Sequence, residues 1–181
     1  MLGELKTEAD YSQALIYLKS AAAKASEECP DGAYVYGMIL AREWDKVEIP
    51  DLVVAPDDHE AKEYIQKAAN LGYVPALYKM GHCYEYATLG CQFDPILSVS
   101  YYKRAAEKGD VEADMALSKW YLCGAEGYFE QNEALAYDHA ERAAMRGLAA
   151  AEFAMGYFHE VGIHVPVNPT HASVWYAKVC K

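Results

Sequence analysis

Small apolar residues return along the chain at a nearly fixed interval. The segment that begins with Ala105-Ala106 and ends at Gly109 has counterparts that begin at Ala68, 37 residues earlier, and at Ala143, 38 residues later. A period between about 20 and 50 residues indicates stacked supersecondary units, none of which buries its apolar face alone. The pattern therefore predicts a repeat array of helix pairs rather than one closed core.

The second helix of each repeat is predicted from its start. An aspartate or asparagine stands 11 residues before the first residue of each terminal pair, and Pro95 and Pro169 follow two of these residues. A short side-chain oxygen accepts hydrogen bonds from the free N–H groups of a first helical turn, and proline fits the next position because it needs no N–H there. The predicted N-caps are Asp10, Asp57, Asp94, Asn132 and Asn168.

The first helix of each repeat has a small residue at its centre. These residues are Gly37, Gly81, Ser118 and Gly156. Glycine inside a helix costs about 1 kcal/mol relative to alanine, so its return predicts that the second helix packs closely against this position. The second helices are predicted to end in a left-handed glycine. These glycines are Gly72, Gly109 and Gly147.

The repeats predict an all-α fold, a right-handed alpha-solenoid, with residues 1–181 in one array. An unpaired second helix at 10–24 precedes helix pairs at 31–72, 75–109, 112–147 and 150–181. The longer first interval predicts an apolar insertion loop at 44–56, which either folds back on the solenoid or contacts a partner. An array without terminal caps indicates either an excerpt of a longer one or an array whose ends are covered by something else, such as self-association through those ends.

Charge and composition exclude several classes of partner. With 16 basic against 27 acidic residues, the formal net charge is −11, which disfavours nucleic acid and anionic membrane surfaces. No leader peptide opens the chain and no apolar run is long enough for a bilayer, so we expect a cytoplasmic protein without direct membrane insertion. The five cysteines form no C-x-x-C pair, and we expect them to be buried free thiols.

No group of residues indicates catalysis, a metal or a cofactor. His159 and His164 are five residues apart, whereas the helical zinc motif needs a spacing of four to place both imidazoles on one face. A hydrolase would need an acid, base or nucleophile in a cleft, and the sequence offers no such set. We therefore expect a protein that is not an enzyme and that binds no cofactor.

Two further positions of the first helices recur away from the small residues, three residues before and one residue after them. Aromatic and methionine side chains there suit peptide capture, and the glutamates one turn later favour a partner that carries lysine or arginine. The alternative is half-buried packing, since aromatic stripes at helical spacing are often core. The predicted concave ladder comprises Tyr34, Met38, Tyr78, His82, Glu85, Tyr86, Met115, Lys119, Leu122, Phe153, Tyr157 and Glu160.

The small-x-x-Tyr-x-x-small signature and the Ala-Ala-x-x-Gly junction resemble Sel1-like repeats, which are TPR-like helix-turn-helix units. Within that superfamily, residues 94–98, 101–109, 112–127 and 156–162 are similar to the fungal chitin synthase activators, also called chitin synthase regulatory factors. Many of these end in a prenylation box, a cysteine fourth from the terminus; because Cys180 is followed only by Lys181, we expect no such anchor in this chain.

This resemblance implies a non-catalytic adaptor that binds and regulates a chitin synthase during cell wall and septum synthesis. It further implies recruitment to the cytoplasmic face of the plasma membrane. The alternative is a general Sel1-repeat scaffold with another client, in a signalling, septin-associated or membrane-protein quality-control complex.

Overall fold

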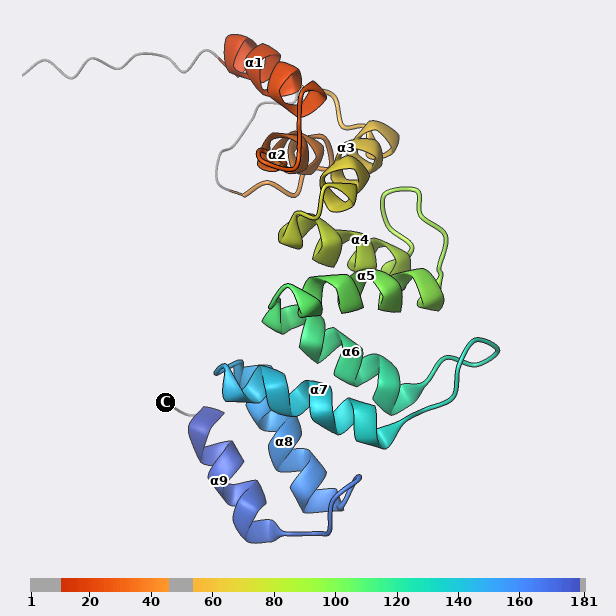
Figure 1. Ribbon diagram of the computed structural model, residues 1–181, viewed down its shortest axis with the longest axis vertical. Coiled ribbons are helices and arrows are strands. Elements are labelled where there is room, and N and C mark those ends of the chain that lie inside the picture. The colour runs from red at the N-terminus through yellow and green to blue at the C-terminus, as the bar shows by residue number, and fades with distance from the viewer. Residues whose placement is uncertain (1–10, 46–53, 180–181) are drawn as a thin grey trace, which may run out of the picture. The chain divides into compact units, whose positions relative to one another are not determined.

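The computed structural model describes residues 11–45 and 54–179, which form nine α-helices and one isolated β-bridge between Ala125 and Phe129 (Figure 1). The helices are α1 (Tyr11–Ala23), α2 (Asp31–Leu40), α3 (Asp58–Asn70), α4 (Val74–Tyr86), α5 (Pro95–Glu107), α6 (Val111–Cys123), α7 (Glu133–Met145), α8 (Ala149–Val161) and α9 (Pro169–Val179). The chain divides into two compact units after Ala76, within α4. The all-α prediction is confirmed.

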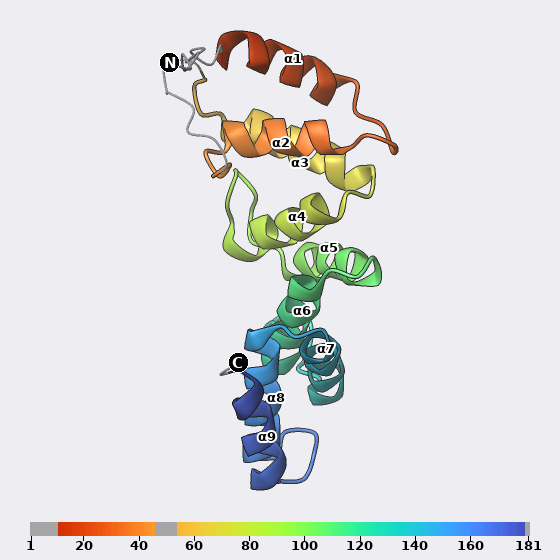
Figure 2. The same cartoon turned by 90° about the vertical axis from the view of Figure 1, so that its left-hand side faces the viewer.

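Consecutive helices pack against one another within each unit. In the first unit α2 packs against α1 and α3. In the second, α5 packs on α6, α6 on α7, α7 on α8 and α8 on α9, and the last pair lies side by side in Figures 1 and 2. The predicted repeat limits and the single array remain predictions.

The predicted N-caps hold the starts of the second helices. The side chains of Asp57 and Asp94 each accept a backbone N–H at 2.9 Å, and those of Asn132 and Asn168 do so at 3.0 Å. In each case the donor lies three residues later, as the capping geometry requires. These four predictions are confirmed, and Asp10 lies outside the described residues.

The predicted helix ends are confirmed as well. The glycines at 72, 109 and 147 have φ of +83°, +90° and +83°. The next backbone N–H returns to the first alanine of each pair, as from Tyr73 to the Ala68 carbonyl at 3.0 Å. This left-handed ending turns the chain into the next helix.

The central small residues allow close contact between the two helices of a pair. A Cβ added at Gly37 would lie 2.9 Å from the Ala61 carbonyl oxygen of α3, and one added at Gly81 would lie 2.7 Å from the Tyr102 ring of α5. Ser118 uses its small polar side chain instead, donating to the Ala136 carbonyl of α7 at 2.7 Å. The predicted contact face is confirmed.

Two other expectations concern the insertion and the cysteines. Residues 46–53 of the predicted insertion lie outside the described residues, so its role stays a prediction; at its far end Arg42 donates to the Val54 carbonyl at 2.6 Å. Cys83 and Cys91 are buried free thiols, but Cys29 and Cys123 are exposed. The expectation of burial was wrong for that pair, because Cys29 lies in the α1–α2 connection and Cys123 is the last residue of α6.

Candidate partner-binding site

The ladder residues differ in exposure. Met38 is only 8% exposed, so it belongs to the packing of the first unit and offers no contact surface. Six ladder residues are half-buried, namely Tyr34, Tyr78, His82, Glu85, Met115 and Leu122. Five are exposed, namely Tyr86, Lys119, Phe153, Tyr157 and Glu160. Apart from Met38, the predicted residues remain accessible to a partner, and their role remains a prediction.

The same tyrosine–glutamate pair forms twice in the second unit. Tyr102 of α5 donates its hydroxyl to Glu85 of α4 at 2.6 Å, and Tyr176 of α9 donates to Glu160 of α8, also at 2.6 Å. Each glutamate follows a central glycine by four residues, so both lie on one face of the first helix. The tyrosine ring crosses over that glycine, where any Cβ would collide with it.

These bonds fix the protonation of the phenols. Burial, together with the bond to Glu85, raises the pKa of Tyr102 far above its ordinary value. The bond to Glu160 is the main reason that the pKa of Tyr176 rises to about 12. Both phenols therefore stay protonated near neutral pH and keep donating, which holds the two ladder glutamates in place.

A small hollow of about 50 Å³ lies between α4, α5 and α6. It brings together residues of the ladder from two successive first helices. Its lining comprises Tyr78, His82, Glu85, Tyr86, Tyr102, Glu112, Met115, Ala116 and Lys119. Six of these nine were predicted as ladder residues, and the structure places them around one point.

Tyr102 and Glu112 were missed as site residues. The position of Tyr102 in a second helix indicated only a bulky packing contact. Glu112 stands in the first turn of α6, three residues before Met115, so a search that extended the ladder by one turn would have included it.

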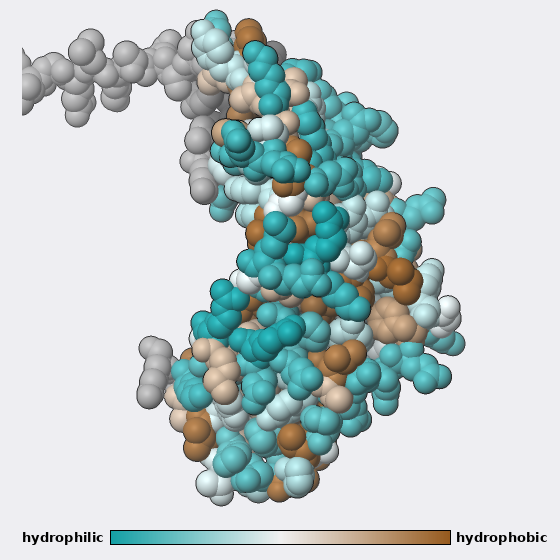
Figure 3. Space-filling view, in the orientation of Figure 1, coloured by the Kyte–Doolittle hydropathy of each residue, from teal (hydrophilic) through white to brown (hydrophobic). Residues whose placement is uncertain are grey.

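A second concavity of about 570 Å³ was also missed. It lies where α5 meets the end of α6 and the connection to α7, with Ile96, Tyr121 and Phe129 in its lining. Figure 3 shows apolar residues gathered on the side of the α4–α5 connection. Phe93, which belongs to this connection, is 52% exposed. Exposed apolar residues beside the Asp94 cap were the signal that could have indicated this surface.

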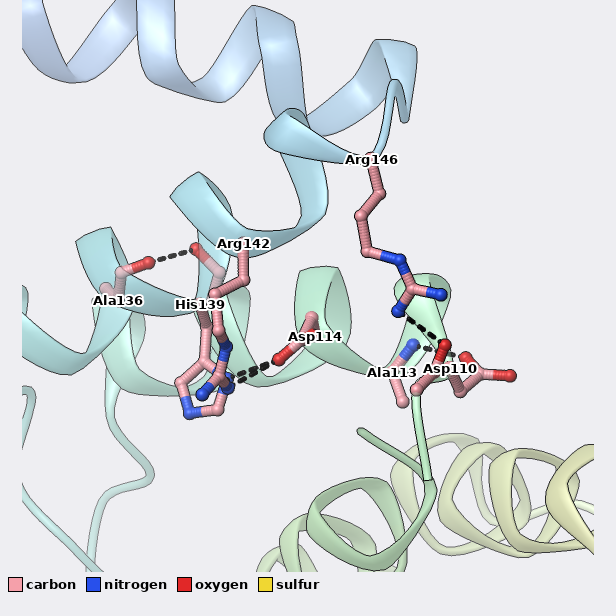
Figure 4. Close-up of polar contacts among 9 residues, drawn as sticks. Asp110, Ala113, Asp114, Ala136, His139, Arg142 and Arg146 are labelled. Carbon is pink, nitrogen blue, oxygen red and sulfur yellow. Dashed lines mark hydrogen bonds and ion pairs between the residues drawn. The ribbon is translucent and has the colours of Figure 1, made fainter. Parts of the chain in front are cut away.

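A buried carboxylate ties α6 to α7. Figure 4 shows His139 and Arg142 of α7 pointing at Asp114, whose side chain is 5% exposed. Their nitrogens lie 2.8 and 2.6 Å from Asp114 Oδ1. Burial by itself raises the pKa of the Asp114 carboxyl, but these two bonds outweigh it and leave the pKa below 3.8. The cluster satisfies its own charges, so it indicates a structural role.

His159 is buried at the contact of α8 with α7 and α9. Its Nε2 lies 3.4 Å from the Tyr137 hydroxyl, and its Nδ1 is buried with no hydrogen-bond partner among the described residues. The His171 ring stands 5.2 Å away. Burial, and then the neighbouring His171, lower the pKa of His159 below 6.5, while Glu141 opposes the shift.

Acidification from pH 7 to about pH 5 is therefore expected to destabilise the second unit through His159. The unfolded chain takes up this proton around pH 6.5, before the folded chain does, so stability is lost as pH falls through that range. His159→Gln should flatten the dependence of the unfolding midpoint on pH, measured in urea. An unchanged slope would contradict the assignment. Asp114 does not contribute to this change in stability. Because the pKa of its carboxyl is lowered, the stability that it provides is lost only below about pH 3.8.

Neither a metal centre nor a membrane span is found in the described part of the chain. Residues 11–45 and 54–179 contain no group of three or more His, Cys, Asp or Glu side chains that could hold a metal ion. Within these same ranges, no helix is long and apolar enough to cross a membrane.

The two helices of each pair pack closely at a central small residue, and the ladder on the first helices is accessible. These features define a helical repeat protein. The chain belongs to the Sel1 repeat family. The Sel1 repeat model matches residues 1–26, 51–73, 74–110, 111–148 and 149–181. Helix α2 falls in the unmatched interval, next to the predicted insertion.

The chain is similar to several fungal regulators. It is 44% identical over 126 residues to chitin synthase regulator SKT5 of Saccharomyces cerevisiae, covering 70% of this chain and 18% of that protein. It is 35% identical over 176 residues to the regulator of the same name from Malassezia restricta, covering 97% and 12%. Against chitin synthase regulatory factor 4 of Schizosaccharomyces pombe, the identity is 35% over 174 residues, covering 94% and 27%. The chain thus spans about a quarter or less of these relatives.

Solved structures support the solenoid fold. A protective antigen of uropathogenic Escherichia coli with an SLR fold superposes with a TM-score of 0.81 at 24% identity, covering 94% of this chain and 34% of that one. A Sel1 repeat protein from Oxalobacter formigenes gives 0.75 at 27% identity, covering 94% and 45%. The predicted alpha-solenoid class is confirmed by this likeness.

Proposed function

We propose that this chain is the repeat region of a chitin synthase regulator and binds the synthase as a non-catalytic adaptor. The observation that carries the proposal is the 44% identity to the Saccharomyces cerevisiae regulator over 126 residues. That identity lies well above the 24% and 27% shared with bacterial proteins of the same fold. The excess over fold-level likeness supports a shared client as well as a shared architecture.

The proposed contact is the ladder of the second unit. Tyr86 and Phe153 are each 57% exposed although both are large aromatics. Exposed aromatics on rigid helices provide contact area at low entropic cost, which is typical of residues that dominate binding. We place this contact on the cytoplasmic side of the plasma membrane, where the adaptor is recruited by its partner rather than by its own insertion.

The test is retention of chitin synthase from detergent-solubilised fungal membranes on the immobilised chain. Tyr86→Ala combined with Phe153→Ala is expected to weaken binding of the synthase about a hundredfold or more, since truncating a hot-spot aromatic costs about 2 kcal/mol and about 1.4 kcal/mol is tenfold. The matched control is Phe93→Ala combined with Tyr128→Ala, because these aromatics are 52% and 51% exposed but lie outside the ladder.

Two outcomes would count against the proposal in different ways. Loss of synthase in the control pair, with retention in the ladder pair, would move the contact to the surface around Phe93 and Tyr128. No retention by the unsubstituted chain, where a full-length relative retains the synthase, would show that these repeats do not carry the binding site.

A scaffold for another client is the second candidate. The chain is 31% identical over 90 residues to activator of C kinase protein 1 of Saccharomyces cerevisiae, covering 46% of this chain. A Sel1 array can therefore resemble regulators that are named for different targets. Crosslinking in fungal cells, followed by identification of the attached proteins, separates the candidates: a kinase-pathway protein without synthase would favour the scaffold.

A further inference from the structure

The hollow between α4, α5 and α6 has aromatic walls. The Tyr78 and Tyr102 ring centroids are 5.4 Å apart, and those of His82 and Tyr86 are 4.5 Å apart. Its volume is about 50 Å³, whereas a cavity needs roughly 10–15 Å³ on the same measure to hold one water. The hollow therefore has room for the head of one side chain in place of a few waters.

The charge around the hollow is negative. Glu85 and Glu112 contribute two carboxylates to its lining, against the single ammonium of Lys119. After burial, the charges of Glu112, Asp110 and Glu85 are the causes that raise the pKa of Tyr78. Three separate carboxylates therefore act on the Tyr78 wall of the hollow. A cation that entered the hollow would be attracted to these negative charges and would offset them.

One of these carboxylates is fixed in advance. Glu85 is held by the Tyr102 hydroxyl at 2.6 Å, and that ring is 1% exposed. An ionised carboxylate has about four lone-pair sites, so one bond to a phenol leaves capacity for further donors. Because Glu85 is already oriented, a partner group would lose less entropy in pairing with it.

We propose that this hollow, the arginine socket, receives one arginine side chain of the protein partner. A guanidinium is planar, stacks on tyrosine faces, donates to carboxylates through its fork of N–H groups and is more weakly hydrated than an ammonium. Aromatic walls with carboxylates beside them match those properties. The inference rests on the proposed function in taking the ladder as the binding face, and it names the side chain that this face selects.

The test uses three short peptides that differ in one side chain: acetyl-Ala-Arg-Ala-amide and its lysine and citrulline analogues. Citrulline keeps the shape of arginine without the charge. Binding is followed by NMR shifts of the Tyr78 and Tyr102 ring protons. The arginine peptide is expected to bind about tenfold more tightly than the citrulline peptide, and more tightly than the lysine peptide.

Substitutions locate the binding. Glu85→Gln combined with Glu112→Gln is expected to weaken arginine-peptide binding about tenfold, while the amide oxygen introduced at position 85 can still accept from Tyr102 and preserve the fold. Glu160→Gln is the matched control, because Glu160 makes the same 2.6 Å bond to a tyrosine but does not line the hollow. A melting curve checks that each variant is folded.

Equal affinity for the arginine and citrulline peptides, or for arginine and lysine, would overturn the socket. So would an effect of Glu160→Gln as large as that of the double substitution. The socket and the proposed function can fail separately. If the Glu85→Gln, Glu112→Gln variant retains the synthase as strongly as the unsubstituted chain does, the socket alone is wrong. If the unsubstituted chain binds the arginine peptide but retains no synthase, only the proposed client is wrong.

Discussion

Phe158→Ala is expected to lower the free energy of unfolding by about 3–5 kcal/mol, the range for truncating a fully buried phenylalanine. Phe158 is 1% exposed, and its ring lies 5.9 Å from that of Tyr137 on α7. Truncation would leave a cavity between α7 and α8 that the helices cannot close without moving. Urea unfolding followed by near-ultraviolet circular dichroism measures the loss.

Phe153→Ala is the matched control for this experiment because it makes the same change in the same helix. Phe153 is 57% exposed and contacts only the edge of the unit, with its ring 5.3 Å from that of Tyr176. We expect a loss of about 1 kcal/mol or less, the value of one aromatic pair. Similar losses for the two variants would show that Phe153 is packed as core, which would remove it from the ladder.

Gly37→Ala is expected to destabilise the first unit by about 1–2 kcal/mol. The new methyl would lie 2.9 Å from the Ala61 carbonyl oxygen and 3.2 Å from the Ile65 backbone nitrogen. Both are backbone atoms of α3, so relief requires the two helices to separate. Overpacking costs about 1–3 kcal/mol, and the helix propensity of alanine returns up to about 1 kcal/mol.

Gly32→Ala provides the comparison within α2. Its added Cβ would meet Ala21 atoms at 3.4 Å or more, which is ordinary contact. This variant is expected to be neutral or up to about 1 kcal/mol more stable. Hydrogen exchange of the α2 and α3 amides reports on this unit directly. Equal protection in the two variants would contradict the close α2–α3 contact as the reason for glycine at position 37.

Phe153 and Phe158 show how one helix serves two purposes. Being five residues apart, they point to opposite sides of α8, so that Phe153 is exposed while Phe158 is buried in the α7–α8 contact. The recurring geometry of the helix pair therefore does not restrict the residues on the ladder.

The local parts of the fold were predictable from the sequence. The Asp94 cap and the left-handed Gly109 depend on interactions within a few residues, so residue type and spacing were sufficient to place them. The glycine at 81 was predictable for a similar reason, because its cost inside a helix has to be offset by close packing. The repeat period then extended each of these local predictions to the other helix pairs.

The candidate site was predictable only in part. Met38 and His82 occupy the same position of the repeat, yet Met38 is buried while His82 lines the hollow. Exposure depends on which neighbouring helix covers a position, and the period does not carry that information. Cys123 was misjudged for the same reason, since burial of a thiol depends on what packs over the end of its helix.

The sequence by itself determined the helix pairs, their caps, their glycine contacts and the family, because each is expressed within one helix or one repeat. Only the tertiary structure decided how separate helices share polar groups. The Tyr102–Glu85 bond spans 17 residues, and the His139–Asp114 contact spans 25. Such pairs form because the packing of two helices brings the groups together and excludes water. The arginine socket depends on three helices at once, so its residues acquire a common role only when the chain is folded.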